Sequence, residues 1–592
     1  MMMSPWSYLF LLSSGVLMVG LLVQRKLKQV PDFVTDVHPE YDYIIVGAGS
    51  AGCVLANRLS DTPSQKVLLL EAGTDDRLHP TVSIPIHAYS SAHSSVDWDY
   101  YTVPQKHALK GFTDQRGWWH RGKILGGTSN VNEMMYLRGL PRDYDKWSEN
   151  GATGWAFKDV FPFFLKSENN ENADFVKTGY HQMGGLLKVG RSKTHSLTNF
   201  LLRSGKEMGY KIIDINGADT EGIVEVQSTL NKGVRQSASS AFLYPVLFRE
   251  NLHVMVDTLI TKILIDDNRA VGVVFTRNST EVVVRARREV ILSAGVVGSA
   301  QLLMLSGIGP KDHLGSLKIP VVADLPVGNN LQDRVMFDYP VAIAQPITIT
   351  PERLQSFWEQ VKYRLVGKGI YASPNGVEVA LFTNTDQNKN TKWPDLQLQF
   401  RGVLSNASYE QMFGYSNKTI SELSERSKFK DGFSCYSILL RPSSKGTLRL
   451  SNTNPRHQPL IDPNYLEKDE DVEVLLSGIK LCKSILDTPS MKHIGAKYAD
   501  IPARSCQTFM FDSDDYWRCL IRARAQPAFS PVGTCKMGNV QDQTTVVDPQ
   551  LRVKGIKNLR VVDASIAPFI TSGGTHIPTI MIAEKASHLI RT

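Results

Sequence analysis

The chain has 592 residues, of which 42% are hydrophobic and 21% are charged, and its formal net charge is +8. A single hydrophobic core rarely serves so long a chain, so two or more closely packed domains are expected. Lysine and arginine are scattered and no nucleic-acid motif is present, which argues against DNA or RNA binding. The six cysteines have no metal-ligand spacing, so no metal site is predicted, and they are too dispersed for a dense disulfide framework.

The amino terminus begins with an apolar segment. Residues 8–23 carry no charge and are followed by Arg25, Lys26 and Lys28. The run is short for a membrane span, which needs about 20 residues, but the residues before it can extend it. Because no small-residue cleavage site precedes the basic cluster, residues 1–30 are predicted to be a retained single-pass anchor. The position of the basic residues favours a cytoplasmic catalytic part.

Entry into the secretory pathway, or secretion after cleavage of residues 1–30, is the alternative. It would suit the three N-x-Ser/Thr sequons and would allow a disulfide bridge among the three late cysteines. These residues are Asn278, Asn406 and Asn417, and Cys506, Cys519 and Cys535.

A dinucleotide-binding unit is predicted from residue 41 onward. The apolar run 43–46 is typical of a buried parallel strand, and it leads through a glycine turn into a helical pattern. Gly47 permits the tight turn, Gly49 lets the backbone approach a pyrophosphate, and Gly52 allows close packing of helix on strand. Ser50 lies within the same turn, where the helix amino terminus attracts phosphate.

A second strand is predicted at 67–70, and it ends at Glu71. Glu71 follows Gly47 by 24 residues, which is about where a carboxylate accepts hydrogen bonds from a ribose diol. A carboxylate at this point repels a 2′-phosphate, so NADP is disfavoured.

A second glycine-rich loop spans residues 122–132, GKILGGTSNVN. Consecutive glycines beside hydroxyl residues let backbone lie against a flat ring or a pyrophosphate. This loop, with 136–139 and 143–145, closely resembles the first signature of the glucose–methanol–choline oxidoreductases. Residues 295–309 resemble the second signature, departing at Val296 and Ala300, and residues 548–565 and 579–586 resemble the family's closing segments.

The resemblance covers roughly residues 40–592 and is strongest to the animal dehydrogenases that include insect glucose dehydrogenases and choline dehydrogenase. It implies an α/β fold, with a Rossmann-like FAD-binding domain and an α+β substrate domain built on an antiparallel sheet. The FAD-binding domain is expected over 40–330 and 540–592, and the substrate domain mainly over 331–539, with the family's carboxy-terminal region beginning near 436.

By position, the resemblance implies a set of FAD contacts. Some relatives attach flavin through a histidine where this chain has Val131, so the FAD is expected to be non-covalent. The expected contacts are Gly47, Gly49, Ser50, Gly52, Glu71, Gly126, Gly127, Thr128, Asn132, Ile260, Asp563 and Ala564.

The resemblance also indicates where the catalytic pair should lie. Oxidising an alcohol requires a base for the hydroxyl proton, and histidine suits that task. Ser530 stands where the family usually has its first histidine, and a serine is no base at neutral pH. His576 aligns with the second position, which is His or Asn in the family. We expect His576 to act as base or oxyanion stabiliser, with Ser530 orienting the substrate hydroxyl.

A second departure is His120, where the family commonly has proline. It could supply a compensating polar group, but drift at a partly exposed site is the preferred interpretation. Several aromatic residues are candidates to line the substrate pocket: Tyr89, Trp98, Tyr100, Tyr101 and Phe413. Helical apolar spacing at 357–365 and 472–486 predicts two core helices, and residues 447–450 a strand.

The predicted function is oxidation of a CH–OH group by hydride transfer to flavin N5, with a quinone, dye-like or protein acceptor rather than oxygen. The predicted partners are a small alcohol, that acceptor and the membrane. Because Ser530 replaces the usual histidine, two alternatives stay open: altered chemistry of a lyase-like or light-driven kind, and a non-catalytic flavin-binding scaffold.

Overall fold

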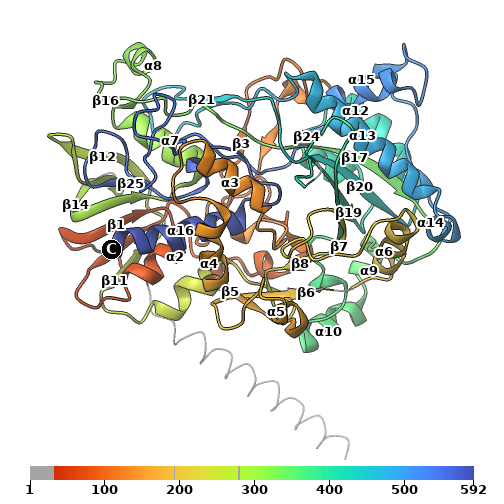
Figure 1. Cartoon of the computed structure of the whole chain (residues 1–592), viewed down its shortest axis with the longest axis horizontal. Helices are drawn as coiled ribbons and strands as arrows, with labels where there is room; N and C mark the ends of the chain where they lie inside the picture. Colours follow the sequence, from red (N-terminus) through yellow and green to blue (C-terminus); the bar gives the residue numbers. More distant parts are fainter. Residues whose placement is uncertain (1–32, 193, 278–279, 391) are drawn as a thin grey trace, which may run out of the picture.

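The computed structural model describes residues 33–192, 194–277, 280–390 and 392–592 (Figure 1). Two seven-stranded sheets organise these residues, one on each side of the view in Figure 1. The predicted anchor, residues 1–30, lies outside the described residues. Among the helices of the described ranges, none combines the length and the hydropathy needed to cross a bilayer.

The first sheet has the strand order β11-β2-β1-β14-β13-β12, and β25 also pairs with β14. β11, β2, β1, β14 and β25 run parallel, whereas β12, β13 and β14 form an antiparallel ribbon. Residues 43–46 of β1 and all of β2 are buried and lack charged side chains, as parallel strands covered on both faces should be. The bounds are β1 Glu40–Val46, β2 Val67–Leu70, β11 Leu252–Met255, β12 Ile260–Asp266, β13 Arg269–Arg277, β14 Thr280–Leu292 and β25 Leu559–Val561.

The second sheet is antiparallel throughout and has the order β23-β17-β20-β19-β18-β7, with β24 on β17. β7 comes from the part of the chain expected in the FAD-binding domain, so that part also contributes a strand to the second sheet. The bounds are β7 Gly222–Glu225, β17 Val335–Ala342, β18 Val377–Thr383, β19 Leu396–Arg401, β20 Gly432–Leu439, β23 Lys497–Tyr498 and β24 Gln526–Pro527.

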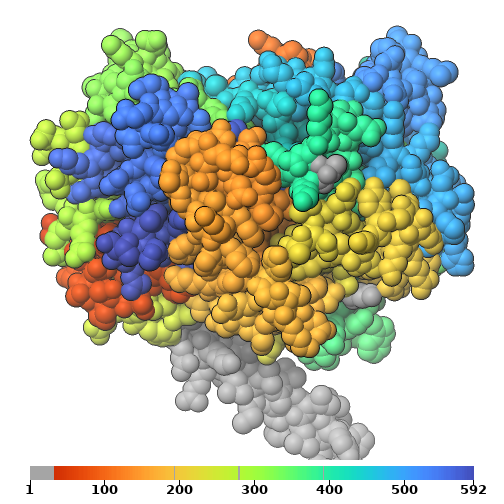
Figure 2. Space-filling model, in the orientation of Figure 1, coloured from red at the N-terminus to blue at the C-terminus, as the bar shows by residue number. Residues whose placement is uncertain are grey.

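Helices cover both sheets. α16 packs on α2 and α4 over the first sheet, and α13 packs on β20 and β19 of the second. α3 and α4 belong to the orange segment that covers the boundary between the two halves in Figure 2. The bounds are α2 Ser50–Leu59, α3 Pro141–Glu149, α4 Phe157–Ser167, α5 Ala173–Lys177, α6 Leu197–Glu207, α7 Gly295–Leu305, α8 Lys311–Ser316, α9 Pro351–Leu354, α10 Phe357–Val366, α11 Ala407–Met412, α12 Asn417–Leu423, α13 Asp469–Leu486, α14 Pro489–His493, α15 Asp514–Arg524 and α16 His576–Arg591.

Short strands complete the architecture. β3 and β4 form a hairpin, β5, β6 and β8 a small sheet, and β9–β10, β15–β16 and β21–β22 separate pairs. The bounds are β3 Tyr100–Tyr101, β4 Trp118–Trp119, β5 Glu168–Asn170, β6 Leu187–Arg191, β8 Gln227–Ser228, β9 Leu230–Asn231, β10 Val234–Arg235, β15 Ile308–Gly309, β16 Ala323–Asp324, β21 Thr447–Arg449 and β22 Leu460–Asp462.

One expectation about the elements is wrong, and one is borne out. α13 is a core helix as predicted, but α10 has no buried residue, so the core role predicted for 357–365 is wrong. The apolar residues of α10 do have helical spacing, but their side chains point outward. Among the late cysteines, Cys506 does bridge Cys519, while an unexpected second bridge joins Cys435 on β20 to Cys482 on α13.

Candidate active site

One cavity runs from the carboxyl ends of β1 and β2 to strands β17, β19 and β20 of the second sheet. Ten of the twelve predicted cofactor contacts line it: Gly47, Gly49, Ser50, Glu71, Gly127, Thr128, Asn132, Ile260, Asp563 and Ala564. Gly52 and Gly126 do not line it. A Cβ on Gly52 would lie 1.9 Å from the carbonyl oxygen of Gly47, so Gly52 packs α2 against the turn rather than meeting a ligand.

The wall formed by the glycine turns fits an extended dinucleotide. Gly47 has a φ of +98°, and a Cβ on Gly127 would lie 2.8 Å from the Cα of Gly49. Gly49 caps α2 without a side chain, which leaves the first amides of the helix directed at this wall. These features leave a narrow groove of backbone between the two glycine turns, here called the cradle, which any side chain at these glycines would fill. The partial positive charge of the α2 amino terminus lies at the cradle, where a pyrophosphate would bind.

Two buried carboxylates flank the cradle. Glu71 accepts hydrogen bonds from the backbone N–H groups of Ala48 and Gly73, each at 2.8 Å, and burial raises its pKa to about 7. Asp563 accepts from the N–H of Gly295 at 2.9 Å and from the hydroxyl of Ser299 at 2.6 Å. Both carboxylates therefore hold backbone at the cradle while they line it.

The second glycine loop is held from behind. The Oδ1 atom of Asn132 accepts a hydrogen bond from Nη1 of Arg235 at 2.8 Å, and Thr128 Oγ1 accepts from the N–H of Gly122 at 3.3 Å. Arg235 is buried, which lowers its pKa to about 9. Because the side chains point into these contacts, the loop presents its backbone to the cavity.

Ser530 lies at the end of the cavity nearest the second sheet. Its backbone N–H donates to Asp333 at 2.7 Å, and its hydroxyl donates to the carbonyl of Ala528 at 3.3 Å. The side chain is 8% exposed. These contacts fix the segment but add no base.

His576 is the first residue of α16, and it lies at the dinucleotide turn. Its Nδ1 is 2.9 Å from Oγ of Ser50, and its Nε2 is buried without a hydrogen-bond partner in the described structure. Burial, and then the charge of Arg235, lowers its pKa to about 4. Although His576 and Ser530 line one cavity, no hydrogen bond between described residues joins them. The structure thus places the predicted pair on the wall of one cavity without a direct hydrogen bond between them.

His120 is 2% exposed and lines the cavity, so the interpretation that it lies at a partly exposed site is wrong. Its ring stacks on Trp118, which also meets Phe529 edge to face, and Arg121 donates to the carbonyl of Phe529 at 2.7 Å. These contacts place His120 beside the segment that carries Ser530. Burial lowers its pKa to about 3.

Sequence reasoning missed Glu133, which follows Asn132 directly and lines the cavity. Its Oε1 accepts from Asn375 at 2.7 Å and from the hydroxyl of Tyr89 at 3.2 Å, and its Oε2 accepts from Gln399 at 2.9 Å. The only feature of the sequence that could have indicated Glu133 as a site residue is the presence of a carboxylate within the first family signature.

Three of the five predicted pocket aromatics line the cavity, namely Tyr89, Trp98 and Tyr100. Tyr101 and Phe413 do not. Phe413 instead packs against Tyr89, with ring centroids 5.6 Å apart, and so supports the cavity wall from behind.

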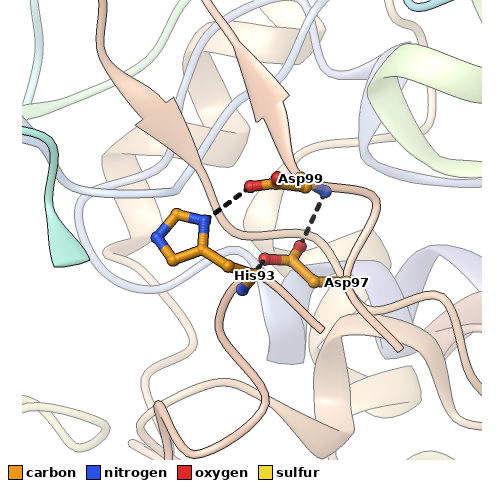
Figure 3. A group of neighbouring side chains, drawn as sticks. All are labelled: His93, Asp97 and Asp99. Atoms are coloured by element: carbon orange, nitrogen blue, oxygen red, sulfur yellow. Dashed lines mark hydrogen bonds and ion pairs between the residues drawn. The ribbon is translucent and has the colours of Figure 1, made fainter. Parts of the chain in front are cut away.

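One group of possible metal ligands occurs in the described ranges: His93, Asp97 and Asp99 (Figure 3). Nδ1 of His93 lies 2.7 Å from Asp99, and its Nε2 lies 2.9 Å from the carbonyl oxygen of Met412. Asp97 accepts backbone N–H groups of His93 and Asp99. Since the protein already occupies these atoms, we assign no metal site.

Comparison with known proteins agrees with this geometry. Models of the GMC oxidoreductase family match residues 41–336 and 442–583. Glucose dehydrogenase [FAD, quinone] of Drosophila melanogaster is 37% identical over 571 residues, covering 96% of this chain and 88% of the relative. Human mitochondrial choline dehydrogenase is 37% identical over 566 residues, covering 93% and 90%. Pyridoxine 4-oxidase from Mesorbium loti superposes with a TM-score of 0.77 at 26% identity, covering 93% of this chain and 98% of that structure.

The predicted resemblance, fold and cofactor are thereby confirmed. The chain belongs to the GMC oxidoreductase family and is an FAD-dependent oxidoreductase that acts on CH–OH donors.

Proposed function

We propose that this oxidoreductase oxidises a small alcohol that carries a second hydrogen-bond donor, and passes the electrons to an acceptor other than oxygen. The observation that carries this proposal is the polar end of the cavity, where Ser530, His120 and Glu133 line the same space as the cofactor cradle. The relatives are named for glucose with a quinone and for choline. A quinone, a dye-like compound or a protein carrier would serve as acceptor here.

The cofactor is proposed to be held without a covalent bond. Gly47, Gly49 and Gly127 would face its pyrophosphate, and Val131 offers no nucleophile for attachment. When bound, FAD supplies the hydride acceptor of the reaction. The protein must supply the base, the orientation of the hydroxyl and the exclusion of water.

Two histidines can take the hydroxyl proton. Burial lowers the pKa values of His576 and His120, so both imidazoles are neutral at pH 7 and each has a lone pair that can take the hydroxyl proton. His576 lies against Ser50 at the dinucleotide turn and its buried Nε2 has no hydrogen-bond partner in the described structure, so of its two predicted roles we assign it that of oxyanion stabiliser.

We assign the base to His120. Its Nε2 lies 3.3 Å from Oγ of Ser91 and 3.9 Å from Oδ2 of Asp97, which favours a proton on Nε2 and leaves the lone pair on Nδ1. No hydrogen bond between described residues occupies that Nδ1. In this arrangement His120 compensates for the histidine missing at Ser530, whose hydroxyl orients the substrate.

Glu133 is proposed to bind the second donor of the substrate. Three hydrogen bonds from Tyr89, Asn375 and Gln399 hold the carboxylate, and about four lone-pair sites are available on its two oxygens. One site remains for a hydroxyl or ammonium group of the substrate. Amino alcohols, diols and sugars therefore suit the cavity better than simple aliphatic alcohols.

An anaerobic titration tests the function. The purified flavoprotein is mixed with a panel of amino alcohols, diols, sugars and matching monoalcohols while the oxidised flavin absorbance is recorded. The proposal predicts bleaching by at least one bifunctional alcohol and much slower bleaching by its monofunctional analogue. Bleaching equally fast with both would remove the role of Glu133.

The alternatives give different outcomes. Retained flavin that no alcohol bleaches, but that bleaches after Ser530→His, would favour altered chemistry that arose by loss of the base. Flavin that never bleaches in either protein would favour a non-catalytic flavin-binding scaffold.

Attachment to a membrane through residues 1–30 remains a proposal, because these residues lie outside the described part of the chain. The two disulfides favour the secretory alternative for the catalytic part over the cytoplasmic side that the basic residues suggested. The sequons Asn406 and Asn417 are both exposed, as glycosylation in that pathway would require.

A further inference from the structure

α10 turns an apolar stripe to the outside of the molecule. Phe357, Trp358 and Leu365 are 68%, 74% and 78% exposed, and Val366 is 60% exposed. Phe357, Val361 and Leu365 are spaced by four residues, so they share one side of the helix, and Trp358 extends that side. In a surface helix such a stripe normally faces the core. A large exposed apolar surface of this kind marks an interaction site.

α10 is held in place by contacts with the rest of the fold, so the exposure of its apolar stripe does not result from a loosely attached helix. Its inner side is fixed by Glu359, which accepts from the N–H of Ile370 at 3.1 Å, and by Tyr363, whose ring stacks on Tyr371 with centroids 5.6 Å apart. Gly367 ends the helix with a φ of +63°, and a Cβ there would lie 2.1 Å from the carbonyl oxygen of Lys232. The stripe therefore cannot turn inward without breaking these contacts.

Basic side chains border the stripe. Lys362, Arg364 and Lys368 are exposed, whereas Glu359 is the one acidic residue between 357 and 368. Glu359 lies 3.9 Å from Lys362, so the three cations exceed the single carboxylate along this segment. An apolar stripe with a tryptophan, bordered by cations, is the pattern of a helix that lies in the surface of a membrane.

The position of α10 agrees with this pattern. The described chain enters the fold near β11, where the N–H of Val34 donates to the carbonyl of Val254. β11 and α10 both lie along the lower edge of the molecule in Figure 1. The uncharged run 8–23 precedes that entry in the sequence. α10 is therefore exposed along the same edge at which the described chain enters the fold.

We propose that α10 is an interfacial docking helix that binds a lipid bilayer through Phe357, Trp358 and Leu365, with Lys362, Arg364 and Lys368 at the headgroups. Ten residues are too few to span a bilayer, which needs about 20, so α10 lies parallel to the surface. It adds a second attachment to that of residues 8–23 and orients the enzyme on the membrane. The proposal does not depend on the identity of the catalytic base.

Site-specific labelling of the full chain tests the proposal. Leu365→Cys is labelled with the environment-sensitive dye NBD. Labelling is selective because Cys53 and Cys535 are buried and the other four cysteines are in disulfides. The control is Met510→Cys, which is 79% exposed and precedes α15 at the opposite edge in Figure 1. Vesicles contain phosphatidylcholine, with and without phosphatidylserine.

We expect NBD emission at position 365 to rise several-fold on vesicles, to be quenched by spin-labelled lipid, and to respond more strongly when phosphatidylserine is present. The label at position 510 should not change. If the protein binds vesicles while both labels remain in water, residues 8–23 act alone and the proposal is wrong.

A triple variant, Phe357→Ser with Trp358→Ser and Leu365→Ser, provides a second measurement. These side chains are exposed, so the fold should be retained. The matched control changes three scattered exposed residues, Val322→Ser, Met510→Ser and Val540→Ser. Removing the stripe should weaken vesicle partitioning by at least about tenfold, and the control should not. Equal partitioning of the parent and the triple variant would assign α10 to another role. A dimer that forms in detergent and is lost only in the triple variant would assign α10 to contact with a second copy of the chain.

Discussion

Burial sets the protonation state of both histidines in the cavity. Removing an imidazole from water disfavours its charged form, which lowers the pKa of His120 to about 3 and that of His576 to about 4. Either ring is therefore neutral at pH 7 and able to accept a proton. Neither needs a pH above the ordinary histidine value of about 6.5 to act as a base.

This predicts the pH dependence of the reductive step. A base works only above its pKa, so the rate falls as the pH falls through that value. The anaerobic rate constant for flavin reduction by a saturating alcohol should stay within about twofold between pH 7 and pH 5. A tenfold fall over that interval, with a midpoint near the ordinary value, would show that the base is a solvated histidine.

Local spacing explains which site residues were predictable. Gly47, Gly49 and Glu71 act through the turn and the two strands that they end, so a short stretch of sequence contains their whole context. Glu133 depends on Asn375 and Gln399, which are 242 and 266 residues away in the chain. Likewise, the burial of His120 follows from its contacts with Trp118 and Tyr89 in the folded protein, not from its position before the glycine loop.

At the scale of elements, β1, the glycine turn and α2 act as one unit. We predict that Gly52→Ala lowers the free energy of unfolding by about 1–3 kcal/mol, because its Cβ would meet the Gly47 carbonyl at 1.9 Å and push α2 from the sheet. Thermal unfolding and flavin content measure the effect.

Gly49→Ala is the matched control, since its Cβ would approach nothing nearer than the Cα of Gly127 at 3.9 Å. That variant should unfold like the parent yet bind FAD more weakly, because the methyl group enters the cradle. Equal stability in both variants would contradict the packing role of Gly52.

Apolar periodicity predicted the existence of helices better than their surroundings. α10 and α13 have similar spacing, but α13 lies against β20 whereas α10 lies on the outside. A period of 3.6 residues identifies a helix with one apolar side, but not what that side meets. The strands at 43–46 and 67–70 were predictable in both existence and burial, because uninterrupted β-branched and aliphatic runs suit a parallel sheet covered on both faces.

At the scale of the whole molecule, the disulfides connect the fold with the compartment. The bridge between Cys435 and Cys482 ties α13 to the second sheet, and the bridge between Cys506 and Cys519 closes the loop before α15. The first pair is separated by 47 residues, so local spacing could not indicate that the two cysteines meet.

When the enzyme is unfolded in denaturant without a reductant and treated with an alkylating reagent, we predict that only Cys53 and Cys535 are alkylated. Intact-mass measurement would show the number of groups added. Reduction should then add four alkyl groups and lower the free energy of unfolding by about 2–4 kcal/mol per bridge. Six groups added before reduction would place the catalytic part in a reducing compartment.

If His120 replaces the histidine missing at Ser530, flavin reduction must depend on His120, which anaerobic stopped-flow absorbance measures. His120→Ala and His576→Ala are compared with the parent at equal flavin content, using the alcohol that bleaches the parent fastest. We expect His120→Ala to slow flavin reduction by at least about 100-fold, and by more than His576→Ala does. Unchanged reduction in His120→Ala, together with loss of reduction in His576→Ala, would contradict it and return the base to His576.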